Sequence, residues 1–171
     1  MSCQAQVMFV GYSAYTMSTE IIYWDSDAFL GWFQEEAGKV ELCEGTLERA
    51  KNGEIIIVTS ALTLAEVLWM RNNPPIVKDK ADIVGRFFRR SYFRVRNVTR
   101  TIAESAQDLV WSHSIKPKDA IHVATAIDAN ATVLETFDDL LIKKSGTVGG
   151  TPYLVIRKPI GLIQGKLFIG K

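Results

Sequence analysis

The hydrophobic positions fall into short continuous runs that alternate with longer stretches of helical periodicity. The runs are rich in β-branched and aromatic residues, which is typical of strands, whereas the longer stretches repeat their apolar positions every three or four residues. This alternation predicts successive βα units around a mainly parallel sheet. We expect five strands, at residues 21–25, 55–59, 92–98, 132–135 and 153–156.

Helices are expected between these strands, and several of their ends carry start or stop signals. Gly53 is placed to cap the second helix, Thr101 with Glu104 forms a capping box for residues 102–113, and Pro117 opens the next helix. The expected helices are residues 29–36, 40–53, 62–70, 78–90, 102–113 and 118–130. Because fully apolar strands are covered on both faces, the sequence predicts an α/β fold, a three-layer α/β/α sandwich with a mainly parallel five-stranded sheet.

The length and hydrophobic content fit one domain. The chain has 171 residues, of which 47% are hydrophobic, enough to bury a core. We expect one α/β domain over residues 19–157. Residues 1–18 are expected to form a poorly ordered N-terminal arm, and residues 158–171 a C-terminal extension whose apolar alternation suits an added strand or an oligomer contact.

The overall charge points to no particular partner. Twenty basic and 19 acidic side chains give a net charge of +1, so no global field indicates nucleic acid or membrane. Cys3 and Cys43 lack the spacing of a zinc site or a disulfide framework, which favours a reducing, cytoplasmic location. No segment is long and apolar enough to span a bilayer, so we expect no membrane association.

Four acidic residues are expected at one edge of the predicted sheet. Asp25 ends the first strand and Asp138 closely follows the fourth. Glu66 lies in the helix after the second strand, and Asp119 opens the helix before the fourth. In parallel sheets, ligands bind outside the carboxyl ends of the strands, so these four residues are the candidates for a site.

Gathering carboxylates has a cost that a divalent cation can offset. Two unit charges about 4 Å apart repel by roughly 4 kcal/mol at an intermediate dielectric. All-oxygen ligands favour hard ions such as Mg²⁺ or Mn²⁺. Such a site can activate water and stabilise the charge of a phosphodiester during displacement.

Each acid also has a purely structural interpretation. Asp27 suits the N-cap of a helix starting at Ala28, Asp139 suits a first-turn acid, and Asp119 could only complement a helix dipole. Glu66 has apolar neighbours in a helix expected to be mostly buried, and buried acids usually have partners.

Other polar and aromatic residues near the acids have two interpretations as well. Ser26 and Thr136 could orient water or phosphate, although local capping is the commoner use of small hydroxyls. His122 shares a helix face with Asp119 and is interpreted as a packed, hydrogen-bonded histidine. The four tryptophans, at positions 24, 32, 69 and 111, are expected in the core.

A basic segment lies at residues 86–100. It contains six arginines and no acid, so the rest of the chain has a net charge of about −5. Arginine suits phosphate contacts and base stacking, which makes this segment a candidate RNA surface. The alternative is a helix end followed by the exposed face of an edge strand. The candidate substrate-binding residues are Arg89, Arg90, Arg94 and Arg96.

These motifs together resemble a PIN domain, in particular the VapC-type ribonuclease toxins of bacterial and archaeal toxin–antitoxin pairs. The resemblance spans roughly residues 21–156. Its matching segments are IIYWDSDAFL with Asp25, TSALTLAEVLW with Glu66, KDAIHVATA with Asp119, and VLETFDDLL with Thr136 and Asp138. Two positions depart from the family pattern: Asp27 replaces a small neutral residue, and Phe137 stands where the family often has Asn.

The resemblance implies a metal-dependent endoribonuclease. Asp25, Glu66 and Asp119 would bind Mg²⁺ or Mn²⁺, and Asp138 would support the metal or the water. The family resemblance also implies an RNA substrate, a homodimer and an antitoxin protein whose tail enters the acidic groove.

Two other functions remain open on the sequence alone. A haloacid dehalogenase-type phosphatase would use Asp25 and Asp27, with Thr59 or Ser60 binding phosphate, but it leaves Glu66 and Asp119 without a role. A non-catalytic RNA-binding module would use the acids only as helix caps.

Overall fold

Five parallel strands form the sheet that the apolar runs predict. The computed structural model describes residues 19–69 and 78–161. Its strands are β1 (Glu20–Trp24), β2 (Ile55–Ser60), β3 (Phe93–Arg96), β4 (Val133–Glu135) and β5 (Val155–Arg157), in the order β3-β2-β1-β4-β5. Every pairing is parallel, which confirms the predicted sheet.

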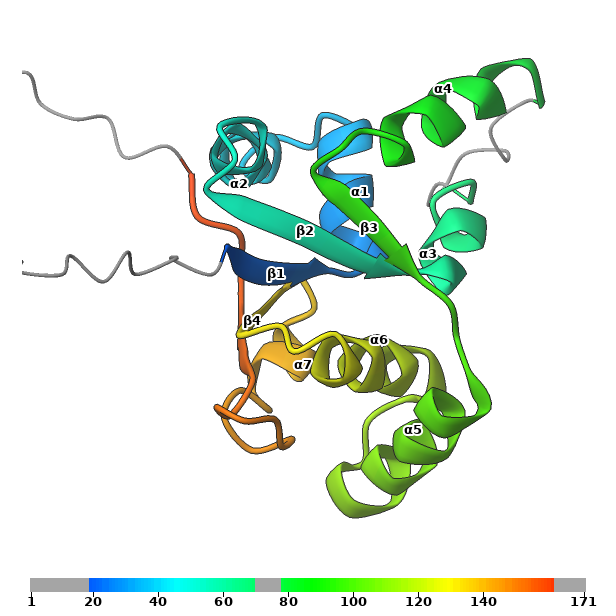
Figure 1. Cartoon of the computed structure of the whole chain (residues 1–171), viewed down its shortest axis with the longest axis vertical. Helices are drawn as coiled ribbons and strands as arrows, with labels where there is room; N and C mark the ends of the chain where they lie inside the picture. The colour runs from blue at the N-terminus through cyan, green and yellow to red at the C-terminus, as the bar shows by residue number, and fades with distance from the viewer. Residues whose placement is uncertain (1–18, 70–77, 162–171) are drawn as a thin grey trace, which may run out of the picture.

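Helices cover both faces of this sheet (Figure 1). One face carries α1 (Ser26–Phe33), α2 (Val40–Lys51) and α4 (Lys78–Phe88), and the other carries α5 (Arg100–His113), α6 (Pro117–Asp128) and α7 (Asp139–Ile142). The short helix α3 (Ala61–Glu66) follows β2 directly at the carboxyl edge of the sheet. The chain therefore forms the predicted three-layer α/β/α sandwich.

The core consists of two apolar clusters, one on each side of the sheet. Ile22 and Trp24 of β1 pack into the cluster under α1, α2 and α4, whereas Tyr23 between them packs against α5 and α6. Successive side chains of a strand point to opposite faces, so a strand buried on both faces must be apolar throughout. This requirement explains the unbroken apolar run that precedes Asp25.

Two predicted helix starts are wrong by two residues. Asp25, not Asp27, caps α1, and its carboxylate accepts a hydrogen bond from the Ala28 amide. Thr99, not Thr101, caps α5 through the Ile102 amide, while Glu104 pairs with Arg100. An N-cap needs an extended backbone, and this property is not visible in the residue types alone.

The segment after β2 also differs from its prediction. Helix α3 ends at Glu66 instead of continuing to residue 70. Trp69 and Trp111 are 67% and 75% exposed, so the expectation that all four tryptophans lie in the core is wrong. Trp111 lies two positions after the buried Leu109 in α5, which places it on a different side of the helix.

The two chain ends fall mostly outside the described residues. Residues 1–18 and 162–171 lie outside the described residues, so the N-terminal arm and the added strand stay predictions. Within residues 19–69 and 78–161, no helix combines the length and the apolar character needed to cross a membrane.

Candidate active site

The order of the strands reverses between β1 and β4, and two of the predicted acids lie at this point. Asp25 directly follows β1, and Asp138 follows β4 by three residues. The neighbouring strands are joined there by a backbone hydrogen bond from the Asp25 amide to the Glu135 carbonyl. Ligands of open α/β sheets bind at such a reversal, so this edge is the candidate site.

Asp25 is a buried carboxylate at the floor of this edge. It is only 6% exposed, and its Oδ1 atom accepts a hydrogen bond of 3.0 Å from the Ala28 amide. Burial raises the pKa of Asp25 to about 6, although the charge of His122 and a hydrogen bond from Thr136 act in the opposite direction. A nearby cation would therefore strongly stabilise the ionised form of Asp25.

Thr136 links Asp25 to Asp138. Its Oγ1 atom accepts a hydrogen bond of 3.0 Å from the Asp138 amide, and its side chain also hydrogen-bonds the Asp25 carboxylate. Thr136 is fully buried, so its hydroxyl positions the two acids. Ser26, the other hydroxyl predicted for substrate binding, is the first residue of α1 and is half-buried.

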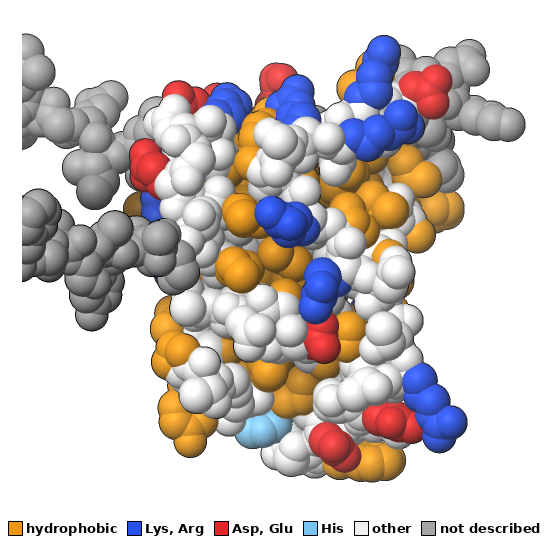
Figure 2. Space-filling model, in the orientation of Figure 1, with side chains coloured by type: hydrophobic (Ala, Val, Ile, Leu, Met, Phe, Trp, Pro, Cys, Tyr) orange, Lys and Arg blue, Asp and Glu red, His pale blue; other side chains and the backbone are white. Residues whose placement is uncertain are grey.

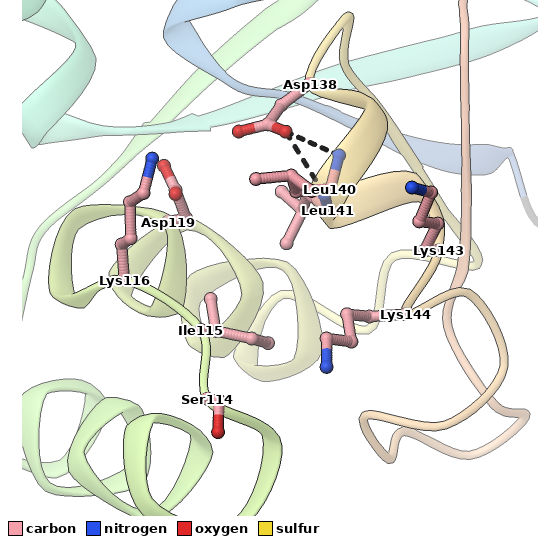
Figure 3. Close-up of a pocket in the computed structure, with 9 residues that line it drawn as sticks. All are labelled: Ser114, Ile115, Lys116, Asp119, Asp138, Leu140, Leu141, Lys143 and Lys144. Atoms are coloured by element: carbon pink, nitrogen blue, oxygen red, sulfur yellow. Dashed lines mark hydrogen bonds between the residues drawn. The ribbon is translucent and has the colours of Figure 1, made fainter.

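Asp138 and Asp119 face the same cavity, which has a volume of about 320 Å³ (Figure 3). One oxygen of Asp138 accepts hydrogen bonds from the Leu140 and Leu141 amides, while the other points toward the side of the cavity that bears Asp119. Asp119 lies in the first turn of α6, which Pro117 opens as predicted. Burial and the charge of Asp138 raise the pKa of Asp119.

Glu66 is held by two basic side chains of α6. Its Oε2 atom lies 2.8 Å from Nε2 of His122, and its Oε1 atom accepts from the ammonium group of Lys118. Burial alone would raise the pKa of Glu66, but the hydrogen bonds and charges of His122 and Lys118 outweigh it and lower the pKa to about 2. Both oxygens of Glu66 are therefore already engaged.

His122 connects the parts of the site, as a packed, hydrogen-bonded histidine. It is 2% exposed, and its Nδ1 atom lies 2.8 Å from the Tyr23 hydroxyl. The charge of His122 acts to lower the pKa of Asp25, Glu66 and Asp119, but burial outweighs it for Asp25 and Asp119, whose pKa values are raised. The spacing of His122 and Asp119 on one helix face was the only sequence signal for this role, and nothing in the sequence indicated that Lys118 would pair with Glu66.

The carboxylates fit a divalent cation in part. Carboxylate oxygens are the ligands that Mg²⁺ and Mn²⁺ prefer, and burial raises the pKa of Asp25 and of Asp119, an effect that a bound cation would offset. However, across residues 19–69 and 78–161 no three His, Cys, Asp or Glu side chains are grouped closely enough to hold an ion. Asp25, Asp119 and Asp138 are suited to act as ligands, whereas Glu66 could join them only by releasing Lys118.

The predicted arginines lie elsewhere on the surface. Arg89 and Arg90 follow α4, and Arg94 and Arg96 lie on the edge strand β3, where all four are exposed. Figure 2 shows basic side chains on the face that bears β3 and the end of α4. Arg90 stacks over the Phe87 ring, Arg96 pairs with Asp128 at 3.0 Å, and none of the four lines the cavity of Asp119.

The PIN domain family model matches residues 22–146, which include all four predicted acids. This chain belongs to the PIN domain family. The PIN domain is also similar in structure to Mycobacterium tuberculosis VapC20, a toxin that cleaves the sarcin-ricin loop, with a TM-score of 0.55 and 17% identity. That similarity covers 70% of this chain and 92% of VapC20, and it shows a common fold. Comparison with curated proteins found no match.

The hydroxyls required by the phosphatase alternative have structural roles in this PIN domain. The Thr59 hydroxyl donates to the Trp24 carbonyl at 2.8 Å and lies 2.8 Å from the Thr63 hydroxyl. Ser60 caps α3 through the Leu62 amide. With these groups engaged, neither the structure nor the family supports a haloacid dehalogenase-type phosphatase.

Proposed function

We propose that this PIN domain is a metal-dependent endoribonuclease that hydrolyses RNA phosphodiesters. The observation that carries the proposal is the position of Asp25 and Asp138 after β1 and β4, between which the strand order reverses, with Asp119 facing the cavity of Asp138 and with burial raising the pKa of Asp25 and of Asp119. The similarity to VapC20, a toxin that cleaves an RNA loop, supports the same reaction class.

In this proposal the chain's own residues hold and orient the reacting groups. Asp25, Asp119 and Asp138 would hold Mg²⁺ or Mn²⁺, with Glu66 joining after it leaves Lys118. The cation supplies activation of water and stabilisation of phosphate charge. Thr136 fixes the positions of Asp25 and Asp138 relative to each other, and His122 fixes the position of Glu66 relative to Asp119.

We further propose that the protein is the toxin of a toxin–antitoxin pair. The support is the toxin identity of VapC20 together with the family resemblance of the sequence. The corresponding partners are an RNA substrate, an antitoxin protein and a second copy of the chain in a homodimer, all acting in the cytoplasm. Growth arrest on expression, relieved by the product of the adjacent reading frame, is the expected result.

The nuclease proposal is tested with the full chain and a short labelled single-stranded RNA. We expect cleavage in Mg²⁺ or Mn²⁺, loss of cleavage in EDTA, and recovery when Mn²⁺ is added in excess. Cleavage that persists in chelator would exclude the metal mechanism. A chain that binds RNA but cleaves none in any divalent metal would favour the non-catalytic RNA-binding module.

A further inference from the structure

The cavity beside Asp119 and Asp138 has walls from three parts of the chain (Figure 3). They are the loop between α5 and α6, the start of α6, and α7 with the two lysines that follow it. Ligand pockets in proteins usually have volumes of about 300–1,000 Å³. A cavity of about 320 Å³ therefore suits one nucleotide of a single strand and is too small for a duplex.

Three lysines line this cavity: Lys116, Lys143 and Lys144. Among the described residues none of the three forms a salt bridge, whereas Lys39, Lys51, Lys118 and Lys158 all do. Lys116 is close enough to Asp119 to act on its charge, and Lys143 and Lys144 lie on the opposite wall. Lys143 and Lys144, which form no salt bridge within the part of the chain that the structure describes, are therefore suited to bind phosphate.

The cavity also presents an apolar surface to solvent. Leu140 is 61% exposed at its rim, next to Leu141, which is 3% exposed and packs into the core. Ile115, 5% exposed, forms part of the wall. A single exposed leucine is common, but here it adjoins lysines and acids in one cavity. Bases and phosphates alternate along a single strand of RNA. An apolar side chain that lies between ammonium groups can therefore contact a base while the ammonium groups contact phosphates.

We infer that this cavity is a subsite for one nucleotide of a single-stranded RNA, in which Lys143 and Lys144 contact phosphate and Leu140 contacts the base. The inference rests on the proposed function, because only a nuclease requires the bound RNA strand to run from this cavity toward the acidic residues. It assigns substrate binding to residues after β4, whereas the sequence pointed to the arginines around β3. Those arginines lie across the sheet from β4, with β2 and β1 between them.

The lysine contacts are tested by RNA binding in a non-cleaving background. The full chain with Asp25→Asn is titrated with short fluorescein-labelled single-stranded RNA over a range of salt concentrations. Adding Lys143→Gln and Lys144→Gln should weaken binding on the order of tenfold and reduce the slope of log K against log salt by about 1.4, the contribution of two phosphate contacts. The matched control, Arg49→Gln with Lys51→Gln, removes the same charge from α2, which contributes no residue to the cavity, and should change binding by less than about twofold.

The base contact is tested with Leu140→Ser in the same background. Because Leu140 is exposed, this change leaves folding intact, and it should weaken binding of RNA by about three- to tenfold. Binding of an abasic strand of the same length should not change. Equal losses for both strands would overturn the base contact.

The outcomes separate this inference from the nuclease proposal. If the wild-type chain cleaves RNA but the cavity lysine variant binds like its control, the subsite is wrong and the nuclease stands. If the wild-type chain cleaves nothing while RNA binding still depends on Lys143 and Lys144, the subsite stands and the nuclease proposal fails.

Discussion

Nε2 of His122 lies 2.8 Å from Oε2 of Glu66, and His122 is three residues after Asp119 on α6. The other ring nitrogen of His122 is held by Tyr23 of β1. The Nε2–H group of His122 donates to the Glu66 carboxylate, while Nδ1 and the Tyr23 hydroxyl share the second hydrogen bond, so both ring nitrogens are satisfied. Residues from β1, α3 and α6 therefore meet at a single side chain, which fixes Glu66 relative to Asp119.

Asp25→Asn should stabilise the protein at neutral pH while abolishing cleavage. The pKa of Asp25 is about 6 in the folded chain and 3.8 as the ordinary value. The folded state therefore binds more protons between these pH values, and the free energy of unfolding falls as the pH rises through them. Asn keeps the oxygen that accepts from Ala28 but has no charge to bury. Urea unfolding at pH 8 should show a gain of about 1–3 kcal/mol.

The pH dependence distinguishes this charge effect from a change in capping. At about pH 3 and below, the wild-type chain and Asp25→Asn should be nearly equally stable, because Asp25 is then mostly protonated in both the folded and the unfolded state. Asp108→Asn, an exposed change in α5, should stay within about 0.5 kcal/mol at every pH. A loss of stability in Asp25→Asn at pH 8 would contradict the argument.

Glu66→Gln should have the opposite effect on stability. The pKa of Glu66 is lowered to about 2, so its ionised form contributes stability that is complete above the ordinary value of 4.5 and is lost as the pH falls toward 2. We expect a loss of about 1–2 kcal/mol at pH 7, reduced from the full shift because Lys118 is largely exposed. Thermal unfolding from pH 7 to pH 3 measures it, and cleavage should also disappear.

A surface carboxylate provides the comparison for Glu66. Glu104 pairs with Arg100 on α5, and both side chains are exposed. Glu104→Gln should cost at most about 0.5 kcal/mol and leave cleavage unchanged. If the stability difference between wild type and Glu66→Gln is the same at pH 3 and pH 7, the ion pairs of Glu66 do not contribute as described.

Glu135→Ala should destabilise the chain by about 3–5 kcal/mol, because it removes a buried acceptor from three donors. Glu135 is fully buried in β4 and accepts from Trp24 at 2.8 Å, from Thr46 at 2.7 Å and from Arg157 at 3.1 Å. Glu135→Gln retains an acceptor for Trp24 and Thr46, so it should cost less, about 1–3 kcal/mol. Urea unfolding of both variants checks this order, and equal costs would contradict it.

The features of the fold that depend on local sequence pattern were predicted correctly. Continuous apolar runs placed the strands, and the positions of Asp25 and Asp138 after two of them placed the candidate edge. Contacts between distant residues were not predictable: the partners of Glu66 lie more than fifty positions away, and those of Glu135 come from β1, α2 and β5. The prediction that Trp69 and Trp111 are buried was wrong for a related reason, because residue type does not show which side of an element faces solvent.

Gly45→Ala should destabilise the protein even though alanine is the better helix former. Gly45 lies in the middle of α2, and a Cβ atom there would lie 2.2 Å from the Ile160 carbonyl oxygen and 2.5 Å from the Gly161 carbonyl carbon. These are backbone atoms, so residues 160–161 must move away from α2, and the gain of about 1 kcal/mol from helix propensity should be exceeded by the lost packing.

The matched control is Gly85→Ala in α4, where the added Cβ would meet the end of the Arg89 side chain at an ordinary 3.5 Å and the propensity gain should remain. Urea unfolding should therefore order the proteins Gly85→Ala, wild type, Gly45→Ala from most to least stable, and limited proteolysis should cut Gly45→Ala faster after residue 157. A Gly45→Ala chain as stable as Gly85→Ala would mean that the segment after β5 does not pack against α2.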